Sequence, residues 1–87
     1  MKKQNQKPQF YDTDFIPVQS SRVDSIKYDG ESETLYVIFK GGKQYSYEDV
    51  SNEEYQSLMS SESIGKSIQT IINNHKCTKL WNQHYRI

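Results

Sequence analysis

The chain has 87 residues, of which 33% are hydrophobic and 13% aromatic, and its formal net charge is zero. A chain of this length forms one domain with a thin core, so we expect a homo-oligomer to supply part of the missing burial. The single Cys excludes an intramolecular disulfide and fits a reducing cytoplasm. Polar residues follow Met1-Lys2-Lys3, so neither a signal peptide nor a membrane contact is predicted.

Charge is unevenly distributed along the chain. Residues 29–62 are strongly acidic, whereas residues 63–87 contain Lys66, Lys76, Lys79 and Arg86 and no acidic residue. A basic segment of this kind can face phosphate or an acidic partner, although a solvated helix face and tail is the more common interpretation. The acidic centre also disfavours a long RNA track and favours a compact ligand or a protein.

The first segment, residues 1–16, is predicted to be a flexible N-terminal arm. It is polar and without periodicity, apart from two apolar pairs. We expect these pairs to dock on the domain or on a second copy of it. They are Phe10-Tyr11 and Phe15-Ile16.

Three strands are predicted in the next part of the chain. Asp29-Gly30 is a turn signal between the first and second strands, and Gly41-Gly42 closes a hairpin between the second and third. The second strand has the clearest pattern, because β-branched and aromatic residues follow one another in it. The predicted strands are residues 20–28, 34–40 and 43–47.

The hairpin allows two registers, which place Tyr45 and Tyr47 on different faces of the sheet. A two-residue loop puts both beside Tyr36, in an aromatic platform suited to stacking bases. A three-residue loop with a bulge pairs Phe39 with Lys43 instead, and this slip moves both tyrosines to the other face. We favour the bulged loop because it gathers one apolar face. That face comprises Leu35, Val37, Phe39, Tyr45 and Tyr47.

Two helices are predicted to follow. Ser51 with Glu54 three residues later is a capping box that opens the first helix, and the polar residues 60–63 end it. A second helix, from about Ser63 to His75, has isoleucines at helical spacing. The predicted inward residues are Tyr55, Leu58, Met59, Ile64, Ile68, Ile71 and Ile72.

The predicted fold class is therefore α+β, with a small three-stranded antiparallel sheet packed against two helices in the order β-β-β-α-α. Residues 17–75 are expected to form the domain, and residues 76–87 a C-terminal tail.

The order of short motifs in the chain resembles the KTSC domain. The resemblance covers roughly residues 17–74 and has the Tyr-x-Tyr as its central mark. Lys27, Ser51 and Ile68 depart from the residue types that are usual there. The motifs are Val18-x-Ser20-Ser21, Ile26-x-Tyr28-Asp29, Leu35-x-Val37-x-Phe39, Gly42-x-x-Tyr45-x-Tyr47, Tyr55-x-x-Leu58 and Ser63-x-Gly65-Lys66.

That domain is named for its place at the C-terminus of some lysyl-tRNA synthetases, and it also occurs as a free-standing protein in bacteria and phages. The resemblance implies no established biochemical activity, and the synthetase context implies RNA binding.

Candidate site residues lie where the predicted strands begin and end. Ser20, Ser21 and Arg22 offer two hydroxyls and a guanidinium to a phosphate, although a Ser pair at a strand start more often satisfies the neighbouring backbone. Tyr45 and Tyr47 can stack bases, although paired tyrosines in a small sheet are more often part of the core.

The start of the second helix is a further candidate. The motif Ser63-x-Gly65-Lys66 resembles the last part of a P-loop. The P-loop needs a Gly five residues before its Gly-Lys pair, and this chain has Ser60 there, which argues against nucleotide hydrolysis. A helix N-terminus with a Lys can still hold an anion. The alternative is that Ser63 is only an N-cap and Gly65 only permits close packing.

No enzyme, cofactor or metal is predicted. His75, Cys77 and His84 include two metal-ligand types, but they lack paired spacing and a fourth partner. No third group marks them as a catalytic Cys–His pair either. The acidic residues fall on loops and a helix start, where solvation or the helix dipole explains them.

We therefore expect a non-catalytic binding module for a phosphate-bearing ligand, either RNA or a nucleotide. The alternative is a small phage-type interaction protein that sequesters a nucleotide immune signal or inhibits a host protein. In the first case, the ligand would meet one concave patch. The predicted patch comprises Ser20, Ser21, Arg22, Tyr45, Tyr47, Gly65 and Lys66.

Overall fold

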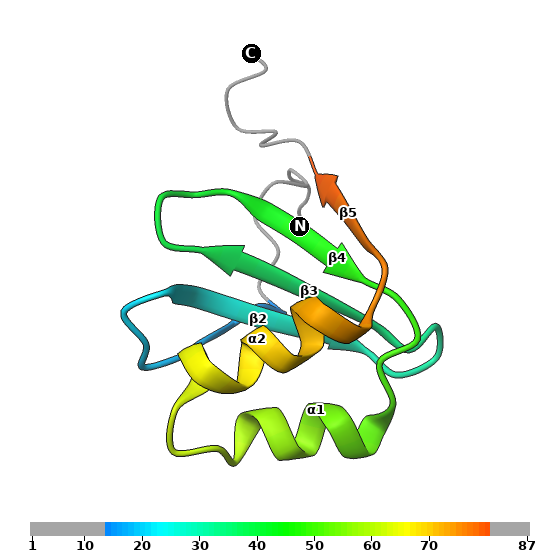
Figure 1. Ribbon diagram of the computed structural model, residues 1–87. Coiled ribbons are helices and arrows are strands. Elements are labelled where there is room, and N and C mark those ends of the chain that lie inside the picture. The colour runs from blue at the N-terminus through cyan, green and yellow to red at the C-terminus, as the bar shows by residue number, and fades with distance from the viewer. Residues whose placement is uncertain (1–13, 81–87) are drawn as a thin grey trace, which may run out of the picture.

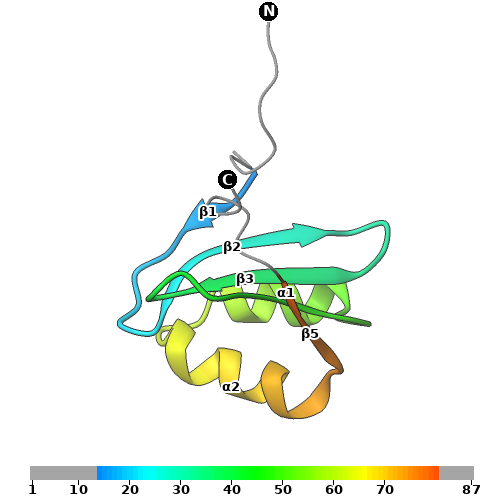
Figure 2. The same cartoon turned by 90° about the horizontal axis from the view of Figure 1, so that it is seen from above.

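The computed structural model describes residues 14–80 and confirms the α+β class, with two helices on one face of an antiparallel sheet (Figure 1). The strands follow one another in the sheet in chain order, and every neighbouring pair is antiparallel. A view turned by 90° shows α1 and α2 on the same side of the sheet (Figure 2). The elements are β1 (Ile16–Pro17), β2 (Val23–Asp29), β3 (Thr34–Phe39), β4 (Gln44–Tyr47), α1 (Asn52–Met59), α2 (Ile64–Asn74) and β5 (Cys77–Leu80).

The sheet has five strands, and the prediction of three was wrong at both edges. β1 lies at the end of the predicted arm and pairs Ile16 with Ile26 of β2, while β5 lies in the predicted tail and pairs with β4. Both strands are short and mostly exposed. They join the sheet through backbone pairing, which requires no alternation of apolar and polar side chains. The other predicted docking pair, Phe10-Tyr11, lies outside the described residues.

The hairpin between β3 and β4 has the bulged register that we favoured. The Phe39 N–H donates to the Lys43 carbonyl oxygen at 2.8 Å, and Val37 stands opposite Tyr45. Both loop glycines have positive φ, 99° at Gly41 and 94° at Gly42, which glycine adopts without steric cost. Tyr45 therefore points to the helix side of the sheet, away from the side that Tyr36 occupies.

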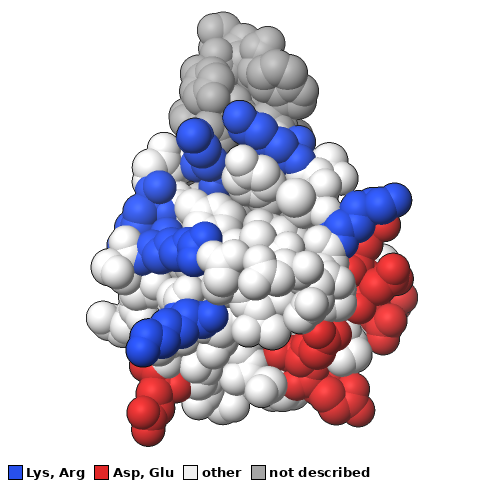
Figure 3. All heavy atoms as spheres, viewed as in Figure 1, with Lys and Arg blue, Asp and Glu red and all other residues white. Residues whose placement is uncertain are grey.

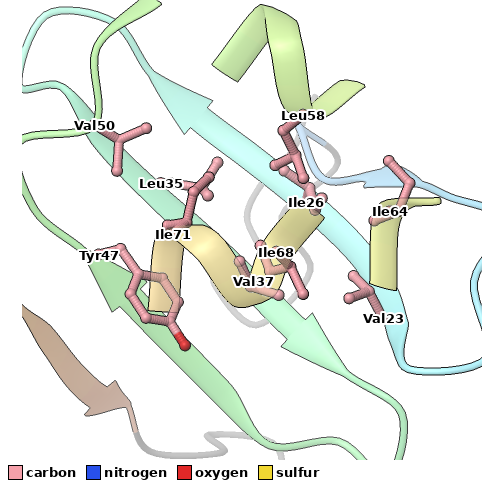
Figure 4. Packing of buried hydrophobic residues seen from close by; sticks show 10 residues of the cluster. All are labelled: Val23, Ile26, Leu35, Val37, Tyr47, Val50, Leu58, Ile64, Ile68 and Ile71. Atoms are coloured by element: carbon pink, nitrogen blue, oxygen red, sulfur yellow. The ribbon is translucent and has the colours of Figure 1, made fainter. Parts of the chain in front are cut away.

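The core lies between α2 and the helix side of the sheet (Figure 4). The isoleucine spacing correctly predicted the buried face of α2, since Ile68 is fully buried and meets the apolar residues of β3. No helix within residues 14–80 is long and apolar enough to cross a membrane. The buried hydrophobic residues are Val23, Ile26, Leu35, Val37, Tyr47, Val50, Leu58, Ile64, Ile68 and Ile71.

The helix starts also follow the prediction. At α1, the Ser51 hydroxyl accepts the Glu54 N–H at 3.1 Å and the Glu54 carboxylate accepts the Ser51 N–H at 3.0 Å, which completes a capping box. At α2, the Ser63 hydroxyl accepts the Lys66 N–H at 3.3 Å. These caps fix where each helix begins.

Candidate ligand-binding face

The fold places most of the acidic side chains at one end of the sheet. The β2–β3 turn and the segment after β4 meet at one end of the sheet, where the Val50 N–H donates to the Glu33 carbonyl oxygen at 2.9 Å. We call this the acidic end. Its carboxylates are those of Asp29, Glu31, Glu33, Glu48, Asp49, Glu53 and Glu54.

The other end of the sheet, which we call the basic end, holds the start of β2, the β3–β4 hairpin and the start of α2. There the Lys40 N–H donates to the Arg22 carbonyl oxygen at 2.9 Å. Figure 3 shows Lys and Arg gathered on the side of the hairpin, and most of the visible Asp and Glu away from it. The cations of the basic end are Arg22, Lys40, Lys43 and Lys66.

Arg22 is held between a helix and a strand. Its Nη1 donates to the Gln69 Oε1 of α2 at 2.8 Å, and its guanidinium carbon lies 5.8 Å from the centre of the Phe39 ring of β3. A guanidinium carries five N–H donors in a rigid fork, so this single bond leaves others for a ligand. Arg22 is exposed and is thus a positioned cation on the surface.

Two rings and two further cations share this surface. Phe39 and Tyr45 pack edge to face with ring centres 5.8 Å apart. Lys79 of β5 stands opposite Tyr45, and Lys43 alternates onto the same face. We call this surface the Arg22 face. It comprises Arg22, Phe39, Lys43, Tyr45 and Lys79.

Tyr47 lies beneath that face rather than on it. Its side chain is only 2% exposed, and its ring centre is 6.5 Å from that of Tyr45 with an angle of 25° between the planes. Burial raises the pKa of the Tyr47 hydroxyl to about 12, so it stays protonated at neutral pH. Tyr47 supports Tyr45, and Tyr45 offers the more accessible ring.

The Ser20 side chain shapes the turn before β2. Its hydroxyl oxygen accepts the N–H groups of Arg22 at 3.0 Å and Val23 at 3.1 Å. This turn explains why β2 begins at Val23 and not at residue 20 as predicted. Ser20 therefore fixes the backbone that carries Arg22, while Ser21 is exposed on the same turn.

Gly65 brings the start of α2 against this turn. A Cβ atom at Gly65 would lie 3.5 Å from the Ser20 hydroxyl oxygen and 3.7 Å from the Arg22 Cβ atom, which are ordinary van der Waals contacts. Lys66, the residue after Gly65, is exposed. The structure therefore brings together four of the predicted site residues, Ser20, Arg22, Gly65 and Lys66, and links them through Phe39 to Tyr45.

The predicted site did not include Phe39, Gln69, Lys43 and Lys79, although Lys79 belongs to the C-terminal segment whose charge can face phosphate. Strand alternation places Lys43 on the face of Tyr45, so that residue could have been included. The place of Lys79 opposite Tyr45 could not be predicted, because it depends on a strand without an alternating pattern. Gln69 could be identified only after the contact between α2 and Arg22 was known.

No group of three His, Cys, Asp or Glu side chains within residues 14–80 is arranged to hold a metal ion. The two ring nitrogens of His75 lie 2.8 Å from the Glu48 carbonyl oxygen and 2.7 Å from the Glu54 Oε2. Cys77 is exposed, and His84 lies outside the described residues. His75 therefore connects the segment after β4 with α1 at the acidic end.

Comparison with known proteins identifies the family. A solved structure, that of the KTSC domain protein YPO2434 from Yersinia pestis, has a TM-score of 0.71 and 33% identity, covering 77% of this chain and 96% of that one. An uncharacterized protein of Stutzerimonas stutzeri is 34% identical over 71 residues, which are 82% of this chain and 89% of that protein. A protein of Tsukamurella paurometabola is 34% identical over 56 residues, 64% of this chain and 84% of that protein. The family model of the KTSC domain matches residues 19–75, and the chain belongs to this family.

Proposed function

We propose that this KTSC-domain protein is a non-catalytic, cytoplasmic binding module for a phosphate-bearing ligand, either RNA or a nucleotide, which docks on the Arg22 face. One observation carries the proposal. The fold gathers cations from the turn before β2, the hairpin and β5 around two partly exposed rings, and it holds most of the acidic residues at the other end of the sheet.

Phosphate recognition is assigned to Arg22. Charge-assisted bonds from a guanidinium to phosphate oxygens are short and often bidentate. The Gln69 amide oxygen and the Phe39 ring already hold the guanidinium in place, so less side-chain freedom is lost when a ligand binds. Lys79 of the same face and Lys66 at the start of α2 add exposed point charges.

Base recognition is assigned to Tyr45. Its ring is half-buried and rests on Tyr47 on one side and against Phe39 on another, which fixes its orientation. Stacking of a base on an aromatic ring contributes about 1–3 kcal/mol and tolerates any base. One ring and a few cations suit a nucleotide or the end of an RNA, and they are too few for a long phosphate track.

The test is a titration of the protein with a mononucleotide, a cyclic dinucleotide and a short single-stranded RNA, followed by calorimetry and NMR. We expect binding by at least one of them, with chemical-shift changes at Arg22, Tyr45 and Lys66. Arg22→Gln should weaken this binding at least tenfold, which corresponds to about 1.4 kcal/mol.

The matched control is Lys76→Gln, which removes a cation at the acidic end, where the Glu48 N–H donates to the Lys76 carbonyl oxygen. That variant should bind as the unaltered protein does. Absence of both heat and shift changes for all three ligands contradicts the proposal, and so does an equal loss in the two variants.

The second candidate is a phage-type interaction protein that sequesters a nucleotide immune signal or inhibits a host protein. It is favoured by the sheet edge at β5, where three of four residues are exposed and the backbone of an outer strand can pair with another chain. Selective binding of the cyclic dinucleotide supports sequestration. Binding of none of the three ligands leaves inhibition of a protein as the leading function.

Self-association is part of the same proposal. The domain is small, and Ile16 at the opposite edge of the sheet is 47% exposed although it is a large hydrophobic residue. Sedimentation at micromolar concentration should show a dimer. A monomer of about 10 kDa at every concentration contradicts this expectation.

A further inference from the structure

The side chain of Arg22 lies along one stripe of helix α2. The stripe begins at Gly65, where a Cβ atom would lie 3.7 Å from the Arg22 Cβ atom. One turn further along α2, the Gln69 Oε1 accepts a hydrogen bond from the Arg22 Nη1 at 2.8 Å. Residues four apart lie on the same face of a helix and about 6 Å apart along its axis. The Arg22 side chain therefore follows α2 from Gly65 to Gln69.

The same stripe continues to Asn73, another turn along α2. The Gln69 Nε2 donates to the Asn73 Oδ1 at 2.9 Å, and this four-residue spacing is the one at which amide side chains bond to each other on a helix. The two bonds occupy both ends of the Gln69 amide. Because its nitrogen is bound to Asn73, its oxygen faces the Arg22 guanidinium. We call Gln69 and Asn73 the amide pair.

The amide pair holds Arg22 without neutralising its charge. Within residues 14–80, no carboxylate forms an ion pair with the Arg22 guanidinium. Helix α2 contains no acidic residue, whereas α1 has Glu53 and Glu54 in its first turn. A guanidinium is not deprotonated in proteins. Arg22 therefore keeps its full positive charge while its orientation is restricted.

A neutral partner and an acidic partner have opposite consequences for an anionic ligand. A carboxylate would also restrict the guanidinium, but it would compete with phosphate for the same N–H donors and cancel their charge. An amide oxygen occupies one donor and leaves the charge and the other donors in place. A cation that is oriented but not neutralised is prepared to bind an anion.

We propose that Gln69, oriented by Asn73, sets the affinity of the Arg22 face for phosphate. Gln69 is a positioning residue, which acts through Arg22 and not by contact with the ligand. This inference rests on the function proposed above, and it identifies the feature that makes the site select an anion.

The first test uses the protein without a ligand. Rotation of a guanidinium about its Cζ–Nε bond is slowed by a hydrogen bond, and NMR of the full ¹⁵N-arginine-labelled chain then shows separate signals for the two Nη groups. We expect separate signals for Arg22 in the unaltered protein. They should merge in Gln69→Leu, which removes the bond, and broaden in Asn73→Leu, which removes the acceptor for Gln69. Asn73→Asp keeps that acceptor and should keep the signals separate.

The second test is a calorimetric titration of Gln69→Glu with the mononucleotide, the cyclic dinucleotide and the short RNA. This substitution replaces one amide nitrogen by an oxygen and gives Arg22 an acidic partner. We expect the affinity of each ligand that binds the unaltered protein to fall at least about tenfold. Gln69→Leu removes the hydrogen bond without adding a charge, so its loss should be smaller, about threefold. The melting temperature of Gln69→Glu should not fall, because the new ion pair is exposed and weak.

The matched control is Gln56→Glu, which makes the same chemical change on the other helix. Gln56 is exposed on α1, and the control gives the chain the same net charge as Gln69→Glu does. Its affinity should stay within about twofold of that of the unaltered protein. An equal loss in the two variants would show a general effect of net charge and would overturn the inference.

Two further results overturn the inference. One is an unchanged affinity in Gln69→Glu, and the other is a single merged Nη signal for Arg22 in the unaltered protein. A failure of the proposed function gives a different pattern, in which the Arg22 signals are separate and depend on Gln69 but none of the three ligands binds. That pattern supports the positioning of Arg22 by Gln69 and contradicts the phosphate-bearing ligand.

Discussion

At the acidic end of the sheet, polar groups are bound to one another, whereas at the basic end most cations extend from the surface. Glu54 completes the cap of α1 and pairs with His75, and the Tyr28 hydroxyl is bound to a backbone carbonyl. At the basic end Arg22 has a side-chain partner, while Lys43 and Lys66 are exposed. The acidic end thus uses its polar groups to hold the fold, whereas the basic end leaves most of its cations exposed.

The largest effect is expected from Tyr47, the buried core residue that supports Tyr45. Tyr47→Ala removes a ring that is only 2% exposed, and such a truncation costs about 3–5 kcal/mol of the free energy of unfolding. Tyr45→Ala should cost less than half as much, because its ring is half-buried. Urea denaturation of both variants measures the difference. Equal losses would show that Tyr45 is a core residue too and would remove it from the ligand surface.

Lys66→Ala separates binding from stability. The Lys66 side chain is exposed, so the melting temperature should change little. Loss of a charge-assisted bond should weaken binding of the phosphate-bearing ligand by about 1–3 kcal/mol. Calorimetric titration and thermal unfolding of the same sample check both statements. A large fall in melting temperature with unchanged affinity would show that Lys66 stabilises the fold. The basic end would then not differ from the acidic end in this respect.

The acidic end should respond to pH through His75 and Glu54. Burial alone would lower the pKa of His75, but hydrogen bonds with the Glu54 carboxylate and the Glu48 carbonyl outweigh it and raise this pKa above 6.5. Hydrogen bonds from the Ser51 N–H and His75 lower the pKa of Glu54 below 4.5. Both ring nitrogens of His75 face acceptors, so the protonated ring, which donates from both, fits the site.

The stabilisation from His75 is fully present below pH 6.5 and is lost as the pH rises through the raised pKa. That from Glu54 is present above pH 4.5 and is lost as the pH falls through the lowered pKa. Stability should therefore fall from pH 6 to pH 8. The expected fall is only about 0.5–1 kcal/mol, because solvent screens the partly exposed carboxylate of Glu54. Denaturation at several pH values checks this, and His75→Gln should remove the slope. If stability still falls between pH 6 and pH 8 in that variant, another group causes the pH dependence.

Much of the fold was predictable because it depends on local patterns. The isoleucine spacing of α2, the Ser51–Glu54 capping box and the parity of the hairpin are each properties of neighbouring residues. The edge strands β1 and β5 were missed because their backbone pairing selects no distinctive side chains. Without β5, the prediction could not place Lys79 opposite Tyr45.

The candidate site was predictable only where two elements meet through short contacts. Ser20 and Gly65 were expected to be neighbours, and the 3.5 Å distance between the Ser20 hydroxyl oxygen and a Cβ atom at Gly65 confirms this proximity. The favoured register put Tyr47 in the apolar face, and its 2% exposure agrees with the alternative that it is a core residue. The sequence shows an acidic stretch at residues 29–62 and a basic one at residues 63–87, but only the fold brings Arg22 and the hairpin lysines to the same end of the sheet as the start of α2.

The smallest effect is expected from Gly65→Ala at the junction between α2 and the turn that carries Arg22. The added methyl group would make ordinary contacts at 3.5 Å and 3.7 Å, and α2 would lose a residue of low helix propensity, so stability should stay equal or rise by up to about 1 kcal/mol. If Gly65 only permits packing, ligand affinity should also stay unchanged. If a phosphate approaches the first turn of α2, the methyl group should hinder it and weaken binding without a loss of stability. Thermal unfolding with titration of the same variant distinguishes the two, and a marked loss of stability would mean that the contact between α2 and the turn is tighter than these distances indicate.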